Sequence, residues 1–269
     1  MRIDNLAALP QYDTFLCDVT PRQLLALAGP RFSRAYRRQL QRFRYGPGAF
    51  KVDYALNRPI PWKASECLRA ATVHLGGTFE EIAASEKTVQ EGHHPDRPFV
   101  LLGQPSLFDS TRAPKGRHTA WAYCHIPNGS EFDMLGRLEG QIERFAPGFR
   151  ECVLSRRVFS PKAMEAMDEN LIGGDIVGGA VDLRQTLCRP TWRRYATPDS
   201  KIYILLIVYA AGRRRTWNVR LSRSEIGRFT NGSRQDFVGG PFVLALSLSS
   251  TSRALDMASS HISVLTSEV

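Results

Sequence analysis

The sequence predicts an α+β protein in which a mixed β-sheet has helices on one side. Two observations lead to this prediction. Short apolar runs, several with the two-residue period of a half-buried strand, alternate with segments of helical period. Helix-start signals, namely capping boxes and prolines at the first helical position, directly follow several of the runs. The chain has 269 residues, 43% of them hydrophobic, which is enough for one large domain or two modest ones.

The N-terminal elements are predicted from cap and turn signals. A strand is expected over residues 14–19 and a helix over 21–28, with Thr20 as its N-cap and Gln23 closing a capping box. A second helix is predicted by apolar residues spaced four, four and three apart: Phe32, Tyr36, Leu40 and Phe43.

The middle of the chain alternates in the same way. The patterns predict strands at 50–56, 71–75, 99–103, 119–125, 153–159 and from 202. They predict helices at 78–91, 134–145 and from 161, the first of these opened by a capping box of Thr78 and Glu81. We expect the runs at 99–103 and 119–125 to pair with each other across a long connection.

The net charge of +10 comes mostly from arginine, and six arginines surround the apolar stripe of the second helix: Arg31, Arg34, Arg37, Arg38, Arg42 and Arg44. They should therefore occupy its exposed face. A solvated face near acidic neighbours is the favoured interpretation, and peripheral contact with a membrane surface is the alternative. We expect no nucleic-acid partner.

Cysteine and histidine usage argues against a metal site or a disulfide framework. The five cysteines are far apart, without a C-x-x-C pair, and are expected to be buried thiols: Cys17, Cys67, Cys124, Cys152 and Cys188. The six histidines show no metal-ligand spacing. The sequence shows no secretory signal and no apolar run of membrane-spanning length, so we expect a cytoplasmic protein, with membrane association as the alternative.

Common catalytic signatures are missing from the sequence. It has no G-x-G-x-x-G after a strand, so a Rossmann fingerprint is absent, and no G-x-x-x-x-G-K-[ST], H-E-x-x-H or G-x-S-x-G. No catalytic residue is therefore assigned.

Several longer motifs, in order along residues 1–204, carry a resemblance to a known family. They are RYGPGAFKVDYALNRPIPW (44–62), TVHLGGTFEEIAASE (72–86), QPSLFDSTRAPKGRHTAWAYCHIPNG (104–129), QIERFAPGFR (141–150) and GGDIVGGAVDLRQ (173–185). The chain resembles the C-terminal half of phytoene dehydrogenase-like FAD-dependent oxidoreductases, a group that includes the pyridine nucleotide-disulfide oxidoreductase domain-containing protein 2 type.

The resemblance implies a two-domain flavoprotein in which FAD takes a hydride from a hydrophobic small molecule. It implies a remnant of the FAD-binding domain at 1–45, a substrate domain at 46–170 and a return into the FAD-binding domain at 171–204. Gly173, Gly174 and Asp175 match the motif beside the flavin. A glycine turn between a helix and a strand is the alternative reading of these residues.

Five residues in the matched motifs are candidates for substrate contact: Trp62, His74, Trp121, Tyr123 and His125. The spacing of two places Trp121, Tyr123 and His125 on one face of a strand. A place in the hydrophobic core is the alternative for each of the five.

The last part of the chain departs from the family. The resembling proteins follow the strand at 202–204 with a glycine-rich segment near the flavin, whereas this chain reads LLIVYAAGRRRTWNVRLSRS. Codons that encode the family segment, when read in a shifted frame, can encode the residues of this chain in the same order. Serine also rises from 9 occurrences in 1–209 to 11 in 210–269. We therefore expect 205–269 to be an out-of-frame, disordered tail.

Two function classes follow. The first is an incomplete copy of an FAD-dependent oxidoreductase, which we expect not to hold FAD stably because both ends of the cofactor site are damaged. The second is a non-catalytic basic module that binds an anionic surface or partner through the Arg31 to Arg44 helix. Tight flavin binding after restoration of the missing parts would favour the first, and steep salt-dependent binding by this chain would favour the second.

Overall fold

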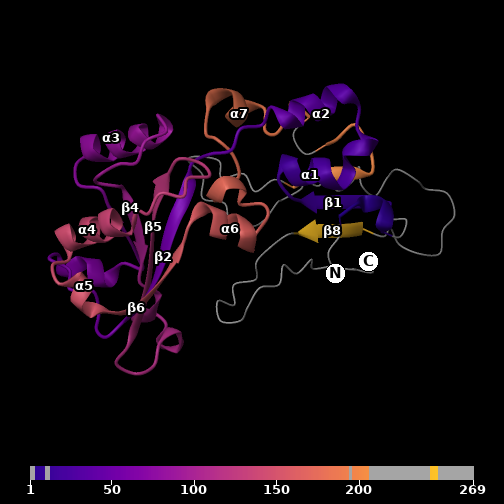
Figure 1. The fold of residues 1–269 in the computed structure, drawn as a ribbon. Coiled ribbons are helices and arrows are strands. Elements are labelled where there is room, and N and C mark those ends of the chain that lie inside the picture. The colour runs from indigo at the N-terminus through magenta and orange to yellow at the C-terminus, as the bar shows by residue number, and fades with distance from the viewer. Residues whose placement is uncertain (1–3, 10–12, 194–195, 206–242, 248–269) are drawn as a thin grey trace. The chain divides into compact units, whose positions relative to one another are not determined.

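The computed structural model describes residues 4–9, 13–193, 196–205 and 243–247. The chain divides into two compact units, which are described separately (Figure 1). Unit 1 takes in the described residues of 1–44, 167–170 and 177–269, and unit 2 consists of 45–166 and 171–176.

Unit 2 is built on a five-stranded sheet in the order β3-β4-β5-β2-β6, and all of its neighbouring strands run antiparallel. Its strands are β2 (Gly48–Leu56), β3 (Thr72–Leu75), β4 (Val100–Gly103), β5 (His118–Ile126) and β6 (Val153–Phe159). Its helices are α3 (Phe79–Gln90), α4 (Leu135–Phe145), α5 (Phe149–Cys152) and α6 (Pro161–Met167), the last of which ends one residue inside unit 1.

The core of unit 2 lies on one face of this sheet. Figure 1 shows α4 and α5 on the same side of the strands. Alternate residues of β2 and β5 supply the sheet side of the core, and α4 and α5 supply the opposing apolar residues, which include Leu138, Ile142 and Phe149. The ring of Phe149 meets that of Tyr54 edge-on, with 5.2 Å between centroids.

Helix α3 begins as its sequence predicts. Thr78 accepts a hydrogen bond from the Glu81 N–H, and the Glu81 carboxylate accepts one from the Thr78 N–H, which completes a capping box. The predicted pairing of the runs at 99–103 and 119–125 is also confirmed, as antiparallel β4 and β5.

Unit 1 contains a three-stranded parallel sheet in the order β7-β1-β8. Its elements are β1 (Thr14–Asp18), α1 (Pro21–Ala28), α2 (Arg34–Gln41), α7 (Leu183–Leu187), β7 (Ile202–Ile204) and β8 (Val243–Ser247). The apolar stripe of the α2 region is buried and most of the surrounding arginines are exposed, as predicted.

Three expectations differ from the structure. The strands lie in two sheets, one antiparallel and one parallel, and not in a single mixed sheet, because the strand pairing is set by contacts between distant segments. Thr20 closes no capping box, because its hydroxyl bonds to the Gln23 side chain itself while its N–H donates to Asn170 Oδ1 at 2.9 Å. Cys67 and Cys188 are only partly buried, unlike the other three cysteines.

The predicted out-of-frame tail lies largely outside the described residues. Within it the structure describes Leu205 and β8, whose backbone pairs with β1 from Thr14↔Val243 to Asp18↔Ser247. The frame shift itself stays a prediction. Within the described chain, none of the helices combines the length and the apolar character that a bilayer crossing requires.

Candidate functional site

The candidate site is the face of the unit 2 sheet that points away from its core. Cross-strand partners share a face, so the register defines two rows on it. One row runs His74–Leu101–Tyr123–Lys51–Phe159, and the next runs Thr72–Gly103–Trp121–Asp53–Arg157. Most of these side chains are exposed or half-buried, in contrast to the fully buried residues that alternate with them.

Two aromatic rings form the centre of this face. The Trp121 and Tyr123 rings are nearly parallel, with an interplanar angle of 7° and 6.3 Å between centroids. Trp121 lies over its cross-strand partner Gly103, where an added Cβ would stand 2.4 Å from the indole Cε2. Gly103 therefore provides the space in which the indole lies flat on the sheet. Together the rings form an apolar, half-exposed surface.

A histidine and a carboxylate border the aromatic rings. The His125 Nδ1 atom lies 2.8 Å from Oε2 of Glu86, which is on α3. The two side chains are 24% and 30% exposed. The His125 ring is 5.8 Å from that of Tyr123, centroid to centroid. A carboxylate on Nδ1 favours the tautomer with its proton there, which leaves Nε2 able to accept a proton.

Charged groups border the aromatic rings on the other side. Lys51 and Asp53, two residues apart on β2, form an ion pair. The Lys51 ammonium also lies 4.9 Å from the centroid of the Phe159 ring, and the Arg157 guanidinium lies 4.8 Å from it. The face is thus apolar at Trp121 and Tyr123 and cationic toward β6.

The structure brings four of the five predicted substrate residues to this face. His74 lies exposed on β3, with its ring 5.5 Å from that of Phe99, and shares the face with Trp121, Tyr123 and His125. The core alternative is therefore wrong for these four. Trp62 is separate from them, because it packs against the core and its Nε1–H donates to Gln104 Oε1 at 3.1 Å.

The Gly173–Asp175 segment joins distant parts of unit 2. Asp175 is fully buried, and its Oδ2 accepts the Gly46 N–H at 2.7 Å. Asn128 Nδ2 donates to the carbonyls of Gly46 and Ile172 at 2.8 and 2.9 Å. These bonds tie the segment to the entry of β2 and to the loop after β5.

Both glycines of this segment have positive φ, +61° at Gly173 and +81° at Gly174. An added Cβ would collide with Asn128 at Gly173 and with Pro161 at Gly174. An added Cβ at Gly48 would likewise stand 2.6 Å from the Gly173 carbonyl oxygen. The glycines thus permit close packing of the protein on itself, and the described residues around them show no cradle open to a flavin.

Several residues of this region were not singled out from the sequence. Lys51 and Asp53 lie within the strand predicted at 50–56, but no functional role was assigned to them. Glu86 lies on a helix that gives no sign of its contact with β5, and Asn128 carries no local signal for its two long-range bonds. No group of three or more His, Cys, Asp or Glu side chains within the described residues is arranged to hold a metal ion.

Comparison with known proteins found no matching family model. The chain is 31% identical over 122 residues to the pyridine nucleotide-disulfide oxidoreductase domain-containing protein 2 of Rattus norvegicus, a match that covers 40% of this chain and 21% of that protein. It is 27% identical over 155 residues to a 4,4'-diapolycopen-4-al dehydrogenase of Metabacillus indicus, covering 54% and 29% of the two chains. The chain thus spans less than a third of the length of these relatives.

Among solved structures, an oxidoreductase from Methanosarcina mazei matches with a TM-score of 0.41 and 13% identity, over 72% of this chain and 37% of that one. The two curated relatives are named as an oxidoreductase domain protein and a dehydrogenase. At low identity, the names of these two relatives therefore agree with the resemblance to oxidoreductases.

Proposed function

We propose that this chain is part of an FAD-dependent oxidoreductase of the phytoene dehydrogenase type and that the sheet face around Trp121 and Tyr123 binds its hydrophobic substrate. The observation that supports the substrate surface is the pair of parallel, half-buried rings of Trp121 and Tyr123, the first of which lies over Gly103. Such rings cost free energy when they face water, and a flat conjugated molecule would cover them. The Metabacillus relative is named for a polyene aldehyde, which suits a surface of this kind.

We include FAD in the proposal because the sequence resembles FAD-dependent oxidoreductases. When bound, FAD accepts a hydride from a substrate carbon. The contact of Gly173, Gly174 and Asp175 with it stays a prediction, because the structure gives these residues a packing role. We therefore derive no step through the flavin from their geometry.

The described residues have definite roles in the proposed site. Trp121 and Tyr123 hold the apolar part of the substrate and exclude water from one side of it. Oxidation of a carbon–hydrogen bond also releases a proton, and Nε2 of His125, oriented by Glu86, is placed to accept one. His74 and Lys51, which lie on opposite sides of Tyr123 in the same row, contribute polar contacts.

The substrate surface can be tested on the chain itself. All-trans-retinal serves as a polyene aldehyde probe. Its binding is measured by the quenching of tryptophan fluorescence. We expect Trp121→Ala to weaken retinal binding about tenfold or more, because it removes most of one aromatic wall. The matched control is Trp62→Phe, on the core side of the sheet, which should leave the affinity unchanged. Equal effects of the two substitutions, or no binding of retinal, would contradict the assignment.

The flavin part of the proposal is tested separately, on the gene. Resequencing of the DNA across codons 200 to 226 and upstream of Met1 would reveal a single-base error and an upstream reading frame with a dinucleotide fingerprint. The protein expressed from the restored frame should then carry stoichiometric FAD. A sequence that stands as written, with no such upstream frame, would contradict it.

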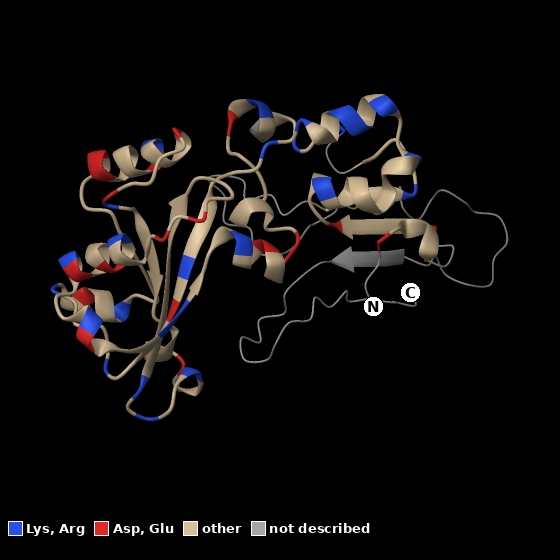
Figure 2. Cartoon of the chain, in the orientation of Figure 1, with Lys and Arg blue, Asp and Glu red and all other residues tan. Residues whose placement is uncertain are grey.

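A second candidate function is binding to an anionic surface through α2. Figure 2 shows basic residues gathered along this helix. Arg34, Arg37 and Arg38 have no ion pair among the described residues, whereas Arg31 is 2.7 Å from Asp199. Binding to phosphatidylserine vesicles that falls steeply with salt and is lost in Arg34→Gln/Arg38→Gln would favour this function.

A further inference from the structure

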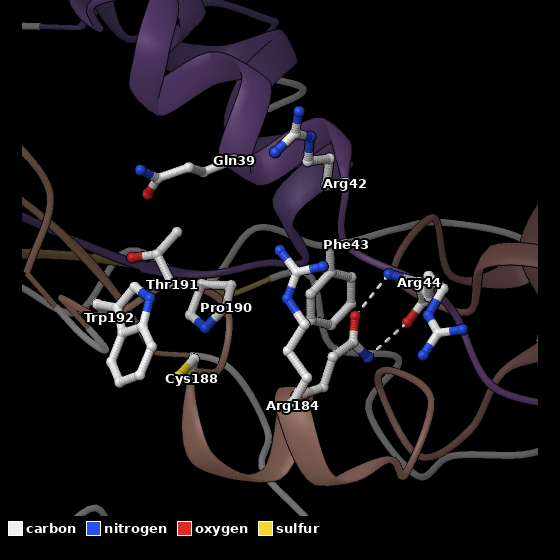
Figure 3. A pocket seen from close by; sticks show the side chains of 10 residues that line it. Gln39, Arg42, Phe43, Arg44, Arg184, Cys188, Pro190, Thr191 and Trp192 are labelled. Carbon is white, nitrogen blue, oxygen red and sulfur yellow. Dashed lines mark hydrogen bonds between the residues drawn. The ribbon is translucent and has the colours of Figure 1, made fainter.

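Unit 1 contains a pocket of about 260 Å³ at the end of α2. The C-terminal end of α2 and the residues after it form one wall, and α7 with the loop after it forms the other (Figure 3). The volume suits a ligand somewhat smaller than most drug-sized molecules. Nothing in the proposed oxidoreductase function uses this pocket.

The walls are held in place by the backbone around Arg44. The Gln185 side chain accepts the Arg44 N–H at 2.7 Å and donates to the Arg44 carbonyl at 2.9 Å (Figure 3). It also donates to the carbonyl of Ala180 at 2.9 Å. Phe43 and Thr191 are buried in the lining, with 8% and 4% of their surfaces exposed. Phe43, Gln185 and Thr191 are thus fixed parts of the lining.

The charges that face the pocket are strongly positive. Arg42, Arg44 and Arg184 all line it. The Arg44 guanidinium is neutralised by Asp182, with 2.6 Å between Nη2 and Oδ2. Arg42 and Arg184 have neither an ion pair nor a side-chain hydrogen bond within the part of the chain that the structure describes. In Figure 3, Arg184 extends from α7 toward Phe43, and the Arg42 guanidinium lies beside the end of α2.

An exposed aromatic ring lies on the same lining. Trp192 is 82% exposed, the highest fraction among the large aromatic side chains of unit 1 for which exposure is described. A lining that holds both an indole ring and two uncompensated guanidinium groups is suited to a ligand with both a planar ring and an anion.

We propose that this pocket binds a small phosphate monoester with a planar ring, of which a nucleoside monophosphate is the simplest biological kind. Its phosphate lies between Arg42 and Arg184, because guanidinium groups match phosphate geometry with paired hydrogen bonds. Its ring stacks on Trp192. Cys188, half-buried in the same lining, becomes covered when the ligand binds.

Uridine 5′-monophosphate is the probe for the test, with uridine and inorganic phosphate as its two parts. Titration calorimetry on the full chain should show binding of uridine 5′-monophosphate, weaker binding of inorganic phosphate and none of uridine. Arg184→Gln should weaken the binding of the nucleotide about tenfold, because one charge-assisted contact is lost. The control is Arg34→Gln, an exposed arginine of α2 outside the pocket, which should bind as the unmodified chain does.

A second readout places the ligand. The nucleotide should slow alkylation of Cys188 by iodoacetamide and leave that of Cys67, a half-exposed thiol of unit 2, unchanged. The proposal would be overturned if the chain did not bind the nucleotide, or if Arg184→Gln and Arg34→Gln reduced its affinity equally. It would also be overturned if the nucleotide did not alter the labelling of Cys188. Failure of this test leaves the oxidoreductase proposal standing, because that proposal concerns a different surface.

Discussion

Gly174 packs directly against the backbone of Pro161, such that an added Cβ would lie 2.7 Å from the Pro161 Cα. The proline is the first residue of α6, so it cannot move aside as a flexible side chain could. We therefore predict that Gly174→Ala destabilises unit 2 by about 3 kcal/mol, the sum of a left-handed backbone cost and overpacking.

Gly92 offers a matched control for that substitution. Its φ is +83°, against +81° at Gly174, but nothing lies within 4 Å of an added Cβ. Gly92→Ala should therefore cost only about 1 kcal/mol, the backbone part of the effect. Urea denaturation measures the free energy of unfolding of both variants. Equal losses of this free energy would show that packing against Pro161 is unimportant.

The capping box of α3 predicts a pH dependence. The hydrogen bonds from Arg144 and from the Thr78 N–H lower the pKa of Glu81 to about 2 from its usual 4.5. A lowered pKa in the folded state stabilises the fold above pH 4.5, and this contribution is lost as the pH falls toward 2. The difference in unfolding free energy between the unmodified chain and Glu81→Gln should therefore be largest near neutral pH and shrink over that range.

A double-mutant cycle checks the cause of this effect. In an Arg144→Gln background, substitution of Glu81 should change stability less, and with a weaker pH dependence, because the main partner of the carboxylate is gone. An unchanged pH profile in that background would mean that Arg144 is not responsible. High salt should also reduce the effect, since the Arg144 side chain is 39% exposed.

The parts of the fold that the sequence predicts are those set by near neighbours along the chain. Thr78 and Glu81 are three residues apart, so their capping box is visible as a motif. The stripe from Phe32 to Phe43 likewise defines its own buried face. Thr20 and Gln23 show the limit of this reasoning, because Asn170, about 150 residues away, takes the Thr20 N–H and changes the local bonding.

The candidate site was predicted in part for the same reason. Alternation places Trp121, Tyr123 and His125 on one face, but it does not say which face is buried. A place in the core was therefore an open alternative for these bulky residues, whereas the core uses the small residues between them, Ala122 and Cys124. Large side chains from α4 and α5 fill the space there, and no pattern within β5 could reveal that.

Thiol reactivity should follow the burial of the five cysteines. Burial raises the pKa of Cys17 and of Cys124 to about 12, and the charge of Glu86 adds to the effect at Cys124. Cys152 is also buried. In the folded chain we expect an aromatic disulfide reagent to titrate two thiols quickly, Cys67 and Cys188, and the other three only slowly. Urea should make all five react, and rapid labelling of Cys124 in the folded chain would be inconsistent with its place in the core.

The contact between Trp121 and Gly103 links the stability of the sheet to its proposed function. Gly103→Ala should push the indole off the sheet and away from Tyr123, because the new methyl group would occupy the position of the ring. Since Trp121 is not fully buried, the stability cost should be modest, about 1 kcal/mol. The effect on retinal binding should be larger and comparable to that of Trp121→Ala. The near-ultraviolet circular dichroism of the stacked pair reports the displacement directly. Retention of both that signal and the retinal affinity in Gly103→Ala would show that the flat placement of Trp121 does not form the binding surface.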